Sequence, residues 1–214
     1  ITSGNAAISA TIIPTLLCPS DGGKNQLASG SGGATNYCPE ASASGTISAA
    51  KTSYEFVSQA NDYRYANNWT YGTFGSRYAF GQNSTTRIAD IIDGTTNTLL
   101  MGERTLETFN GIYSTGSWAY RSTLQLGIDP VGTYNITFPA QGLNIWNYNN
   151  NAASNIRGTR ATWYNAASLH TGGVNFVFAD GSVRFIQESI DVPSLTYLCQ
   201  IAWHQDHARW SGNN

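Results

Sequence analysis

Three histidines occur in the sequence, and two of them, His204 and His207, stand three positions apart near its end. On a helix this spacing places both imidazoles on one face, with Asp206 nearby in the chain. Such a set can bind Zn²⁺ or another transition metal, but the same residues are also common as solvated polar side chains. We therefore regard them as weak metal ligands and expect neither a resident metal nor a cofactor.

The third histidine, His170, precedes Asp180 by an interval of nine residues in the stretch SLHTGGVNFVFADGSVRFI, residues 168–186. Alternating apolar residues joined by Asp180-Gly181 predict a β-hairpin with a two-residue turn. This register sets Phe178 opposite Val183 and predicts one buried face, formed by Phe176, Phe178, Val183 and Phe185. Six strand residues separate His170 from the turn by roughly 20 Å. The spacing therefore reflects strand length and does not form a catalytic dyad.

Glu103 ends the run NTLLMGE, which predicts a buried strand, and it would need a partner if it were enclosed. Either Arg104 or His170 could supply one, and we expect Glu103 to have a structural role. Asp93-Gly94 marks a turn upstream, in which Asp93 is expected to bond its own backbone. The sequence contains neither a Gly-x-Ser-x-Gly elbow nor a phosphate-binding glycine loop. It therefore predicts no enzyme.

Charged residues make up only 11% of the 214-residue chain, against about 25% in an average soluble protein. The polar surface must then be built from Asn, Ser, Thr, Gly and Tyr, which favours an extracellular or tightly packed setting. A net charge of −2 offers nucleic acid no basic patch. No apolar run is long enough to span a bilayer. Because the chain begins at Ile1, we expect a processed or truncated product.

Cys18 and Cys38 each precede a proline and bracket a Gly/Ser-rich segment. In an exported protein they are expected to form a disulfide, worth about 3 kcal/mol by the chain-entropy model. The alternative is two free thiols near a turn. Cys199, in an apolar helical pattern, is expected to be a buried thiol.

The segment 54–81 is rich in aromatic residues separated by Gly and Asn, a pattern typical of short strands and tight turns. Its rings could stack on the C–H faces of a sugar, or they could fill a small core or a subunit interface. The residues concerned are Tyr63, Tyr65, Trp69, Tyr71, Phe74 and Tyr78.

The element pattern predicts a single mainly β, α+β domain over 1–214, with an antiparallel sheet. Residues 20–52 and 139–165 are expected to form long irregular loops. One helix is predicted over 194–210, begun by Pro193-Ser194. Its apolar face would consist of Leu195, Leu198, Cys199, Ala202 and Trp203.

Four segments, in order, resemble the prepilin-type processing-associated His-x9-Asp-Gly family of bacterial proteins: LLCPSD at 16–21, ATNYCPEASASGT at 34–46, IADIIDGTTNTLLMGER at 88–104, and residues 168–186. The residues that carry this motif here are His170, Gly172, Gly173, Asp180, Gly181, Asp93, Gly94 and Glu103. The resemblance implies the globular head of a pilin-like protein at the bacterial cell surface. Its N-terminal hydrophobic helix, trimmed by a prepilin peptidase, would be missing here and would be its only membrane contact. The loop 139–165 and the tail 202–214 depart from the family pattern.

We therefore expect an exported, non-catalytic structural subunit of a pilus-like fibre or lattice, whose partners are further copies or other pilin-like subunits. The alternative is a cell-surface polysaccharide-binding module that uses the aromatic segment 63–80. In either case His170 is expected to be structural and to pin the entry to the hairpin.

Overall fold

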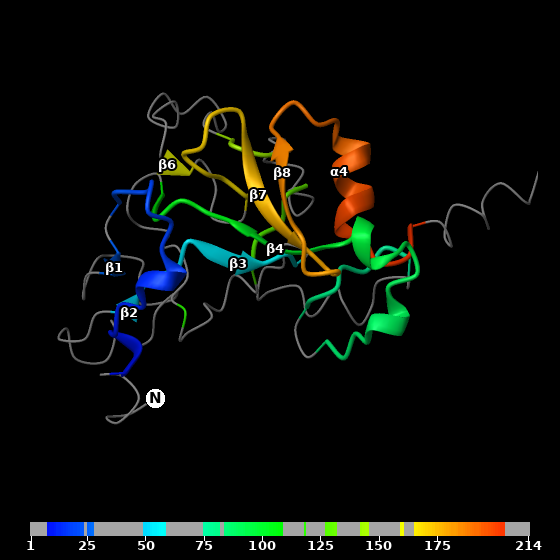
Figure 1. Cartoon of the computed structure of the whole chain (residues 1–214), viewed down its shortest axis with the longest axis horizontal. Helices are drawn as coiled ribbons and strands as arrows, with labels where there is room; N and C mark the ends of the chain where they lie inside the picture. Colours follow the sequence, from blue (N-terminus) through cyan, green and yellow to red (C-terminus); the bar gives the residue numbers. More distant parts are fainter. Residues whose placement is uncertain are drawn as a thin grey trace, which may run out of the picture.

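The computed structural model describes residues 8–23, 25–27, 49–58, 75–81, 84–108, 118, 127–131, 142–145, 159–160 and 165–203 (Figure 1). The helices, 3₁₀ turns and strands in this part of the chain are, in order, η1 (Pro14–Leu16), β1 (Gln26–Leu27), β2 (Ala49–Ala50), β3 (Tyr54–Phe56), η3 (Ile88–Asp90), η4 (Thr95–Asn97), β4 (Leu99–Glu103), β5 (Glu107–Thr108), β6 (Thr159–Arg160), β7 (Gly173–Phe178), β8 (Val183–Gln187) and α4 (Val192–Cys199).

The centre of the fold is a four-stranded antiparallel sheet with the strand order β3-β4-β7-β8. Two smaller pairs accompany it, the antiparallel β1-β2 and the parallel β5-β6. Strand β4 is the run NTLLMGE that the sequence predicted as a strand, and it lies between β3 and β7. The predicted mainly β, α+β class with an antiparallel sheet is confirmed.

The hairpin β7-β8 forms, but the predicted register is wrong by one residue. Val177, and not Phe178, lies opposite Val183. The loop is a turn closed by the Gly181 amide donating to the Phe178 carbonyl at 2.9 Å, and the Phe178 amide donates to Ser182 at 2.9 Å. Gly181 has φ +82°, whereas Asp180 does not share the positive φ that a two-residue type I′ turn demands. A three-residue loop with glycine at its bulge position results.

The one-residue shift exchanges the faces of β8, because side chains alternate along a strand. Phe176 and Phe178 are buried as predicted, but Val183 and Phe185 point to the other side and are 65% and 45% exposed. The backbone amide of Ala179 donates to the carbonyl of Thr98, just after η4, at 2.9 Å. The amide of Asp180 donates to the carbonyl of Thr95, in η4, at 3.1 Å. This docking of the turn onto another segment favours the longer loop.

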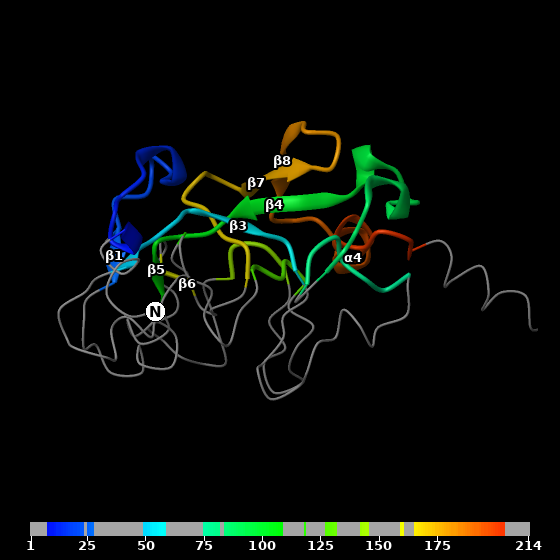
Figure 2. The ribbon, with the colours of Figure 1, turned by 90° about the horizontal axis from the view of Figure 1, so that it is seen from below.

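One face of the sheet carries the core. Phe176 and Phe178 pack there with residues from the helix, from the neighbouring strand β4 and from distant loops, including Val57, Leu99, Ile128, Leu195 and Cys199. Figure 2 shows α4 on this side of the sheet, while the segment 8–23 rises beyond the opposite side at one end.

The opposite face bears a row of apolar side chains that crosses all four strands. Cross-strand pairing aligns Phe56 with Met101, Met101 with Val177, and Val177 with Val183. We call these four residues the outer strip. Phe56 is 37% exposed and Val183 is 65% exposed, so the strip faces outward.

Helix α4 is shorter than predicted, since it spans Val192–Cys199 and not 194–210. Asp191 caps its N-terminus by accepting from the Ser194 amide at 2.8 Å. After Cys199 the chain becomes extended, because Gln200 forms a β-bridge with Tyr78. Ile201 and Ala202 are buried in a second small cluster with Ala79 and not on a helical face. Cys199 is a buried thiol, as predicted.

Most of the predicted loops 20–52 and 139–165 lie outside the described residues. Among the residues that are described, no helix combines the length and apolar character needed to cross a membrane.

Candidate functional site

The structure brings together three side chains that are far apart in the sequence. Cys18 follows η1, Glu103 ends β4, and His170 lies in the turn before β7. His170 Nε2 is 3.2 Å from Glu103 Oε1 and 3.9 Å from Cys18 Sγ. The three donor atoms all lie within 4.8 Å of one another. Cys18 and Glu103 are 7% and 4% exposed, whereas the His170 side chain is 36% exposed.

Cys18 is held by the short LLCPSD segment. Its backbone amide donates to Ser53 Oγ at 2.9 Å, and the Ser53 amide donates back to Leu16 at 2.8 Å. Asp21 accepts from the Leu106 amide at 2.7 Å, just beyond the end of β4. These bonds fasten both ends of the segment to the sheet, so the Cys18 sulfur points inward.

The predicted Cys18–Cys38 disulfide is wrong at the Cys18 end. Cys18 is a free thiol whose sulfur contacts Ser20 Oγ at 3.0 Å as well as His170. Cys38 lies outside the described residues. The inward position that the backbone bonds impose directs the sulfur toward Glu103 and His170.

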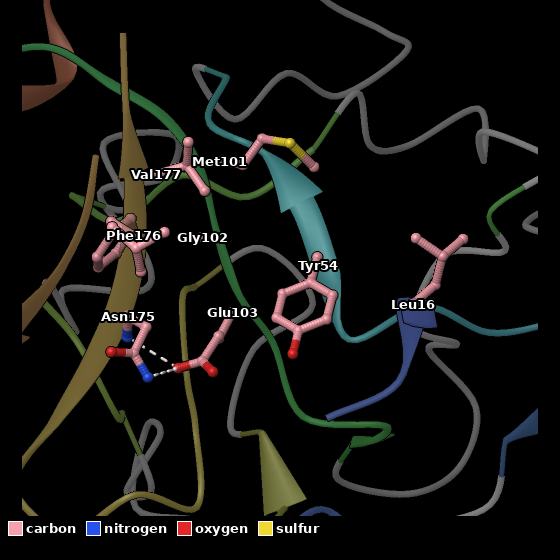
Figure 3. Close-up of a pocket in the computed structure, with 9 residues that line it drawn as sticks. Leu16, Tyr54, Met101, Gly102, Glu103, Asn175, Phe176 and Val177 are labelled. Atoms are coloured by element: carbon pink, nitrogen blue, oxygen red, sulfur yellow. Dashed lines mark hydrogen bonds between the residues drawn. The ribbon is translucent and has the colours of Figure 1, made fainter. Parts of the chain in front are cut away.

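Glu103 uses its two oxygens for different partners. Oε2 accepts from the Asn175 backbone amide at 2.8 Å and from Asn175 Nδ2 at 3.2 Å (Figure 3). Oε1 is thereby presented to His170. His170 is one of the two partners that the sequence offered for this carboxylate. The other, Arg104, instead forms a fully buried ion pair with Glu55 at 2.9 Å.

His170 is placed by a turn that feeds β7. Its amide donates to Ser168 Oγ at 3.1 Å, and that hydroxyl donates to the Gly173 carbonyl at 2.7 Å. Gly172 has φ +84°, which reverses the chain into the strand. Gly173 abuts β8 so closely that a Cβ there would lie 2.2 Å from the Ile186 carbonyl oxygen. The two glycines of the motif thus serve different backbone requirements.

Asp180, at the far end of β7, takes no part in this site. It accepts from the Ser182 amide and hydroxyl at 2.9 and 2.7 Å, and pairs with Arg184 at 3.2 Å. These bonds to Ser182, with the nearby Arg184, hold the pKa of the Asp180 carboxyl below its usual value. The Asp of the His-x9-Asp-Gly motif therefore stabilises the turn, while its His faces Glu103.

Tyr54, on β3, faces the same region, and the pKa of its phenol reflects the electrostatics of the site. Partial burial raises the pKa of the Tyr54 phenol, and the nearby acidic groups of Cys18 and Glu103 raise it further. The phenol therefore stays protonated beside the cluster at neutral pH.

The arrangement differs from a nucleophilic relay. In a Cys-His-carboxylate relay the nucleophile and the carboxylate bind opposite nitrogens of the imidazole. Here Cys18 and Glu103 both approach Nε2 of His170. A thiol, an imidazole nitrogen and a carboxylate oxygen that converge on one point are instead suited to hold a metal ion.

A groove of about 550 Å³ opens beside the cluster on the outer face of the sheet. The polar end of this groove is formed by Glu103, Asn175 and Tyr54 (Figure 3). Met101 and Val177 line the opposite part of its wall. The groove thus joins the outer strip to the Glu103 carboxylate.

Most of the other predicted site residues fall outside the part of the chain that the structure describes. Tyr63, Tyr65, Trp69, Tyr71 and Phe74 are outside the described residues, as are His204, Asp206 and His207.

Tyr78 cannot contribute an exposed ring, since it is 2% exposed and donates to Asp129 at 3.1 Å. Of the two alternatives given for Tyr78, the core is confirmed and the glycan platform is not, because the ring is buried in the core cluster that includes Val57 and Leu99. The Asp93 carboxylate accepts from the Trp203 amide and so ties the turn before η4 to the chain after α4, and within the turn the Asp93 carbonyl accepts from Asn97 Nδ2 at 3.0 Å. Gly94 has φ +96°, consistent with the predicted turn.

The grouping of Cys18 with Glu103 and His170 was missed from the sequence, where Cys18 was paired with Cys38. The signal that could have found it is that each of the three residues stands in a segment that carries the family resemblance: LLCPSD, LLMGER and SLHTGG. Segments that form one motif set are expected to meet in space.

The fold and site define a mainly β protein with an antiparallel sheet and, at one end of it, a Cys-Glu-His cluster in which the cysteine and glutamate are buried and the histidine is partly exposed. The chain belongs to the family described as protein of unknown function (DUF1559), which it matches over residues 2–193. This range includes all three residues of the cluster. A search of curated proteins and a search of solved structures each found no match.

Proposed function

We propose that the protein is an exported, non-catalytic structural subunit that assembles through the outer face of its sheet into a pilin-like surface fibre or lattice. The observation that carries this proposal is the outer strip, an unbroken apolar row across four strands on a chain with few charged residues. The partner is a second copy of the chain or another pilin-like subunit.

The exposed side chains give this face a driving force for association. Val183 and Phe185 expose 65% and 45% of their surface, and Phe56 exposes 37%. Burying an apolar side chain of this size completely is worth about 1.5–3 kcal/mol, so each would contribute about 1 kcal/mol in an interface. Antiparallel sheets associate through such faces when side chains from both interdigitate.

The resemblance to the prepilin-type His-x9-Asp-Gly family supports the same proposal. The residues that carry that resemblance, 168–186, build the hairpin that contributes Val177 and Val183 to the outer strip. The geometry of the cluster supports a non-catalytic role, because the Cys18 thiol and the Glu103 carboxylate approach the same nitrogen of His170, whereas a nucleophilic relay needs them on opposite nitrogens.

The test is the association of Val183→Ser, measured by sedimentation velocity over a range of protein concentrations. We expect wild-type protein to associate and Val183→Ser to shift the transition to higher concentration by about fivefold, the equivalent of about 1 kcal/mol. Ile88→Ser is the matched control, since Ile88 is 75% exposed but lies on η3 and is not one of the four residues of the strip. Equal effects of both variants, or a wild type that stays monomeric, would contradict the proposal.

A polysaccharide-binding module is the second candidate. One observation favours it: Phe80, at the end of the aromatic segment 63–80, lies against Phe56 with ring centroids 4.6 Å apart. The aromatic segment thus reaches the outer strip at β3. Saturable binding in a glycan panel that Trp69→Ala abolishes, in protein that does not self-associate, would favour this function.

A further inference from the structure

We propose that Cys18, Glu103 and His170 form a binding site for a thiophilic divalent transition metal ion, with Zn²⁺ as its reference ligand. The ion would be bound by Cys18 Sγ, Glu103 Oε1 and His170 Nε2, with a fourth position left for water on the exposed side of the His170 ring.

The separations between the donor atoms fit a tetrahedral ion. Typical zinc–sulfur, zinc–nitrogen and zinc–oxygen bonds of about 2.3, 2.0 and 2.1 Å place sulfur and nitrogen about 3.5 Å apart, nitrogen and oxygen about 3.3 Å apart, and sulfur and oxygen about 3.6 Å apart. In the structure the first two pairs are separated by 3.9 Å and 3.2 Å. The third pair, Cys18 Sγ and Glu103 Oε1, lies within 4.8 Å, so a closing movement of up to about 1 Å brings all three atoms to bonding distance.

The surroundings hold two of the donors in place, as ligand-orienting groups do in metal sites. Asn175 binds the second oxygen of Glu103 through both its backbone amide and its side chain, which directs Oε1 to the centre of the cluster. The Ser53 hydroxyl accepts from the backbone amide of Cys18. Both arrangements are present in the structure before any ion binds.

The donor set selects the class of metal. A thiolate and an imidazole favour zinc and its neighbours among the later transition metals, whereas calcium and magnesium prefer oxygen donors alone. One thiolate and one carboxylate balance the charge of a divalent ion. Binding replaces the S–H bond of Cys18 by a sulfur–metal bond and releases the thiol proton to solvent.

The ion would join three parts of the chain. Cys18 lies on the segment after η1, Glu103 ends the central strand β4, and His170 precedes β7. The metal would thus fasten the LLCPSD segment to the end of the sheet, and its removal would loosen that segment first.

The first experiment measures binding of ZnCl₂ and CoCl₂ to the full 214-residue chain after treatment with chelator. Calorimetry should give one ion per chain, and Co²⁺ should produce the near-ultraviolet charge-transfer absorption of a cobalt–thiolate bond. Absence of binding by both ions, or binding of cobalt without the thiolate band, overturns the proposal.

Cys18→Ser and His170→Gln should each weaken zinc binding by at least about 100-fold, beyond the loss common for a residue that only orients a ligand. The matched control is the double variant His204→Ala/His207→Ala, which removes the other histidines and should bind zinc as the wild type does. Loss of binding in the control alone would place the ion at the C-terminal pair and overturn the proposal.

A measurement on folded protein guards against variants that do not fold. In a Cys38→Ser background Cys18 should be alkylated faster than Cys199, because Cys18 is 7% exposed beside the partly exposed His170, whereas Cys199 is 0% exposed and burial raises its pKa well above the ordinary value. Zinc should slow alkylation of Cys18 at least about tenfold, and chelator should restore it, as expected for a thiolate held by a metal. Alkylation at an unchanged rate with saturating zinc overturns the proposal.

Discussion

At Gly173 the backbones of β7 and β8 approach closely, and substitution of this residue gives a sharp test of the hairpin. A Cβ added there would lie 2.2 Å from the Ile186 carbonyl oxygen and 2.8 Å from two ring carbons of Phe185. Carbon and oxygen normally approach to about 3.3 Å, so the first residues of β7 would have to move by about 1 Å. The Gly173 carbonyl also accepts from Ser168 and from Asn144, at 2.7 and 3.3 Å.

We therefore expect Gly173→Ala to combine overpacking, about 1–3 kcal/mol, with weakening of a buried hydrogen bond, about 1 kcal/mol. The total loss in the free energy of unfolding should be about 3 kcal/mol. For a chain of this size, that corresponds to a melting temperature lower by roughly 6–12 °C. Urea unfolding followed by tryptophan fluorescence measures the loss directly.

Two other glycines provide controls for Gly173→Ala. Gly22 has open space around it, and Gly22→Ala should change stability by less than about 0.5 kcal/mol. Gly172 also has open space but a φ of +84°, so Gly172→Ala should cost about 1 kcal/mol from backbone strain alone. If Gly173→Ala were as stable as Gly22→Ala, the close approach of the two strands would be refuted.

Three further outcomes are expected. Gly181→Val should cost about 2 kcal/mol, because φ +82° strains a β-branched residue although no atom obstructs it; an unchanged melting temperature would contradict the bulged turn. The intact mass should be the same with and without reductant because Cys18 is a free thiol; a mass higher by two protons after reduction would show that Cys18 forms a disulfide. Burial, followed by the charge of Asp129, raises the pKa of Tyr78 well above 10.0. The contribution of the protonated Tyr78 phenol to the free energy of unfolding is therefore present below pH 10.0 and is lost as the pH rises above it. When the pH is raised from about 8 to about 11, the urea midpoint of Tyr78→Phe should therefore fall less than that of the wild type. Equal falls would refute the raised pKa of Tyr78.

Local patterns predicted much of the sheet. Alternation around Asp180-Gly181 located the hairpin, and the apolar run before Glu103 located β4, because side-chain periodicity is a property of each strand alone. The register was beyond this reasoning, since Asp-Gly fits both a two-residue and a three-residue loop. Hydrogen bonds from the turn to the residues around η4 favour the longer loop, and only the fold supplies that neighbour.

The C-terminal helix shows the same limit. Its start follows from local signals, an Asp191 cap before Val192 and Pro193. Its end does not, because the apolar spacing continues through Ala202 and Trp203. The chain leaves the helix at Gln200 to pair with Tyr78, a residue more than a hundred positions away.

For the site, the sequence by itself determined that Glu103 would need a partner and that His170 would stand at the entry to the hairpin. It also determined that His170 and Asp180 would lie apart, since a strand of fixed rise separates them. The tertiary structure decided the rest. Cys18 meets Glu103 and His170 because Ser53 and Asp21 fasten its segment across the end of the sheet. Such contacts join segments more than thirty residues apart, and no periodicity within a segment records where the chain will return.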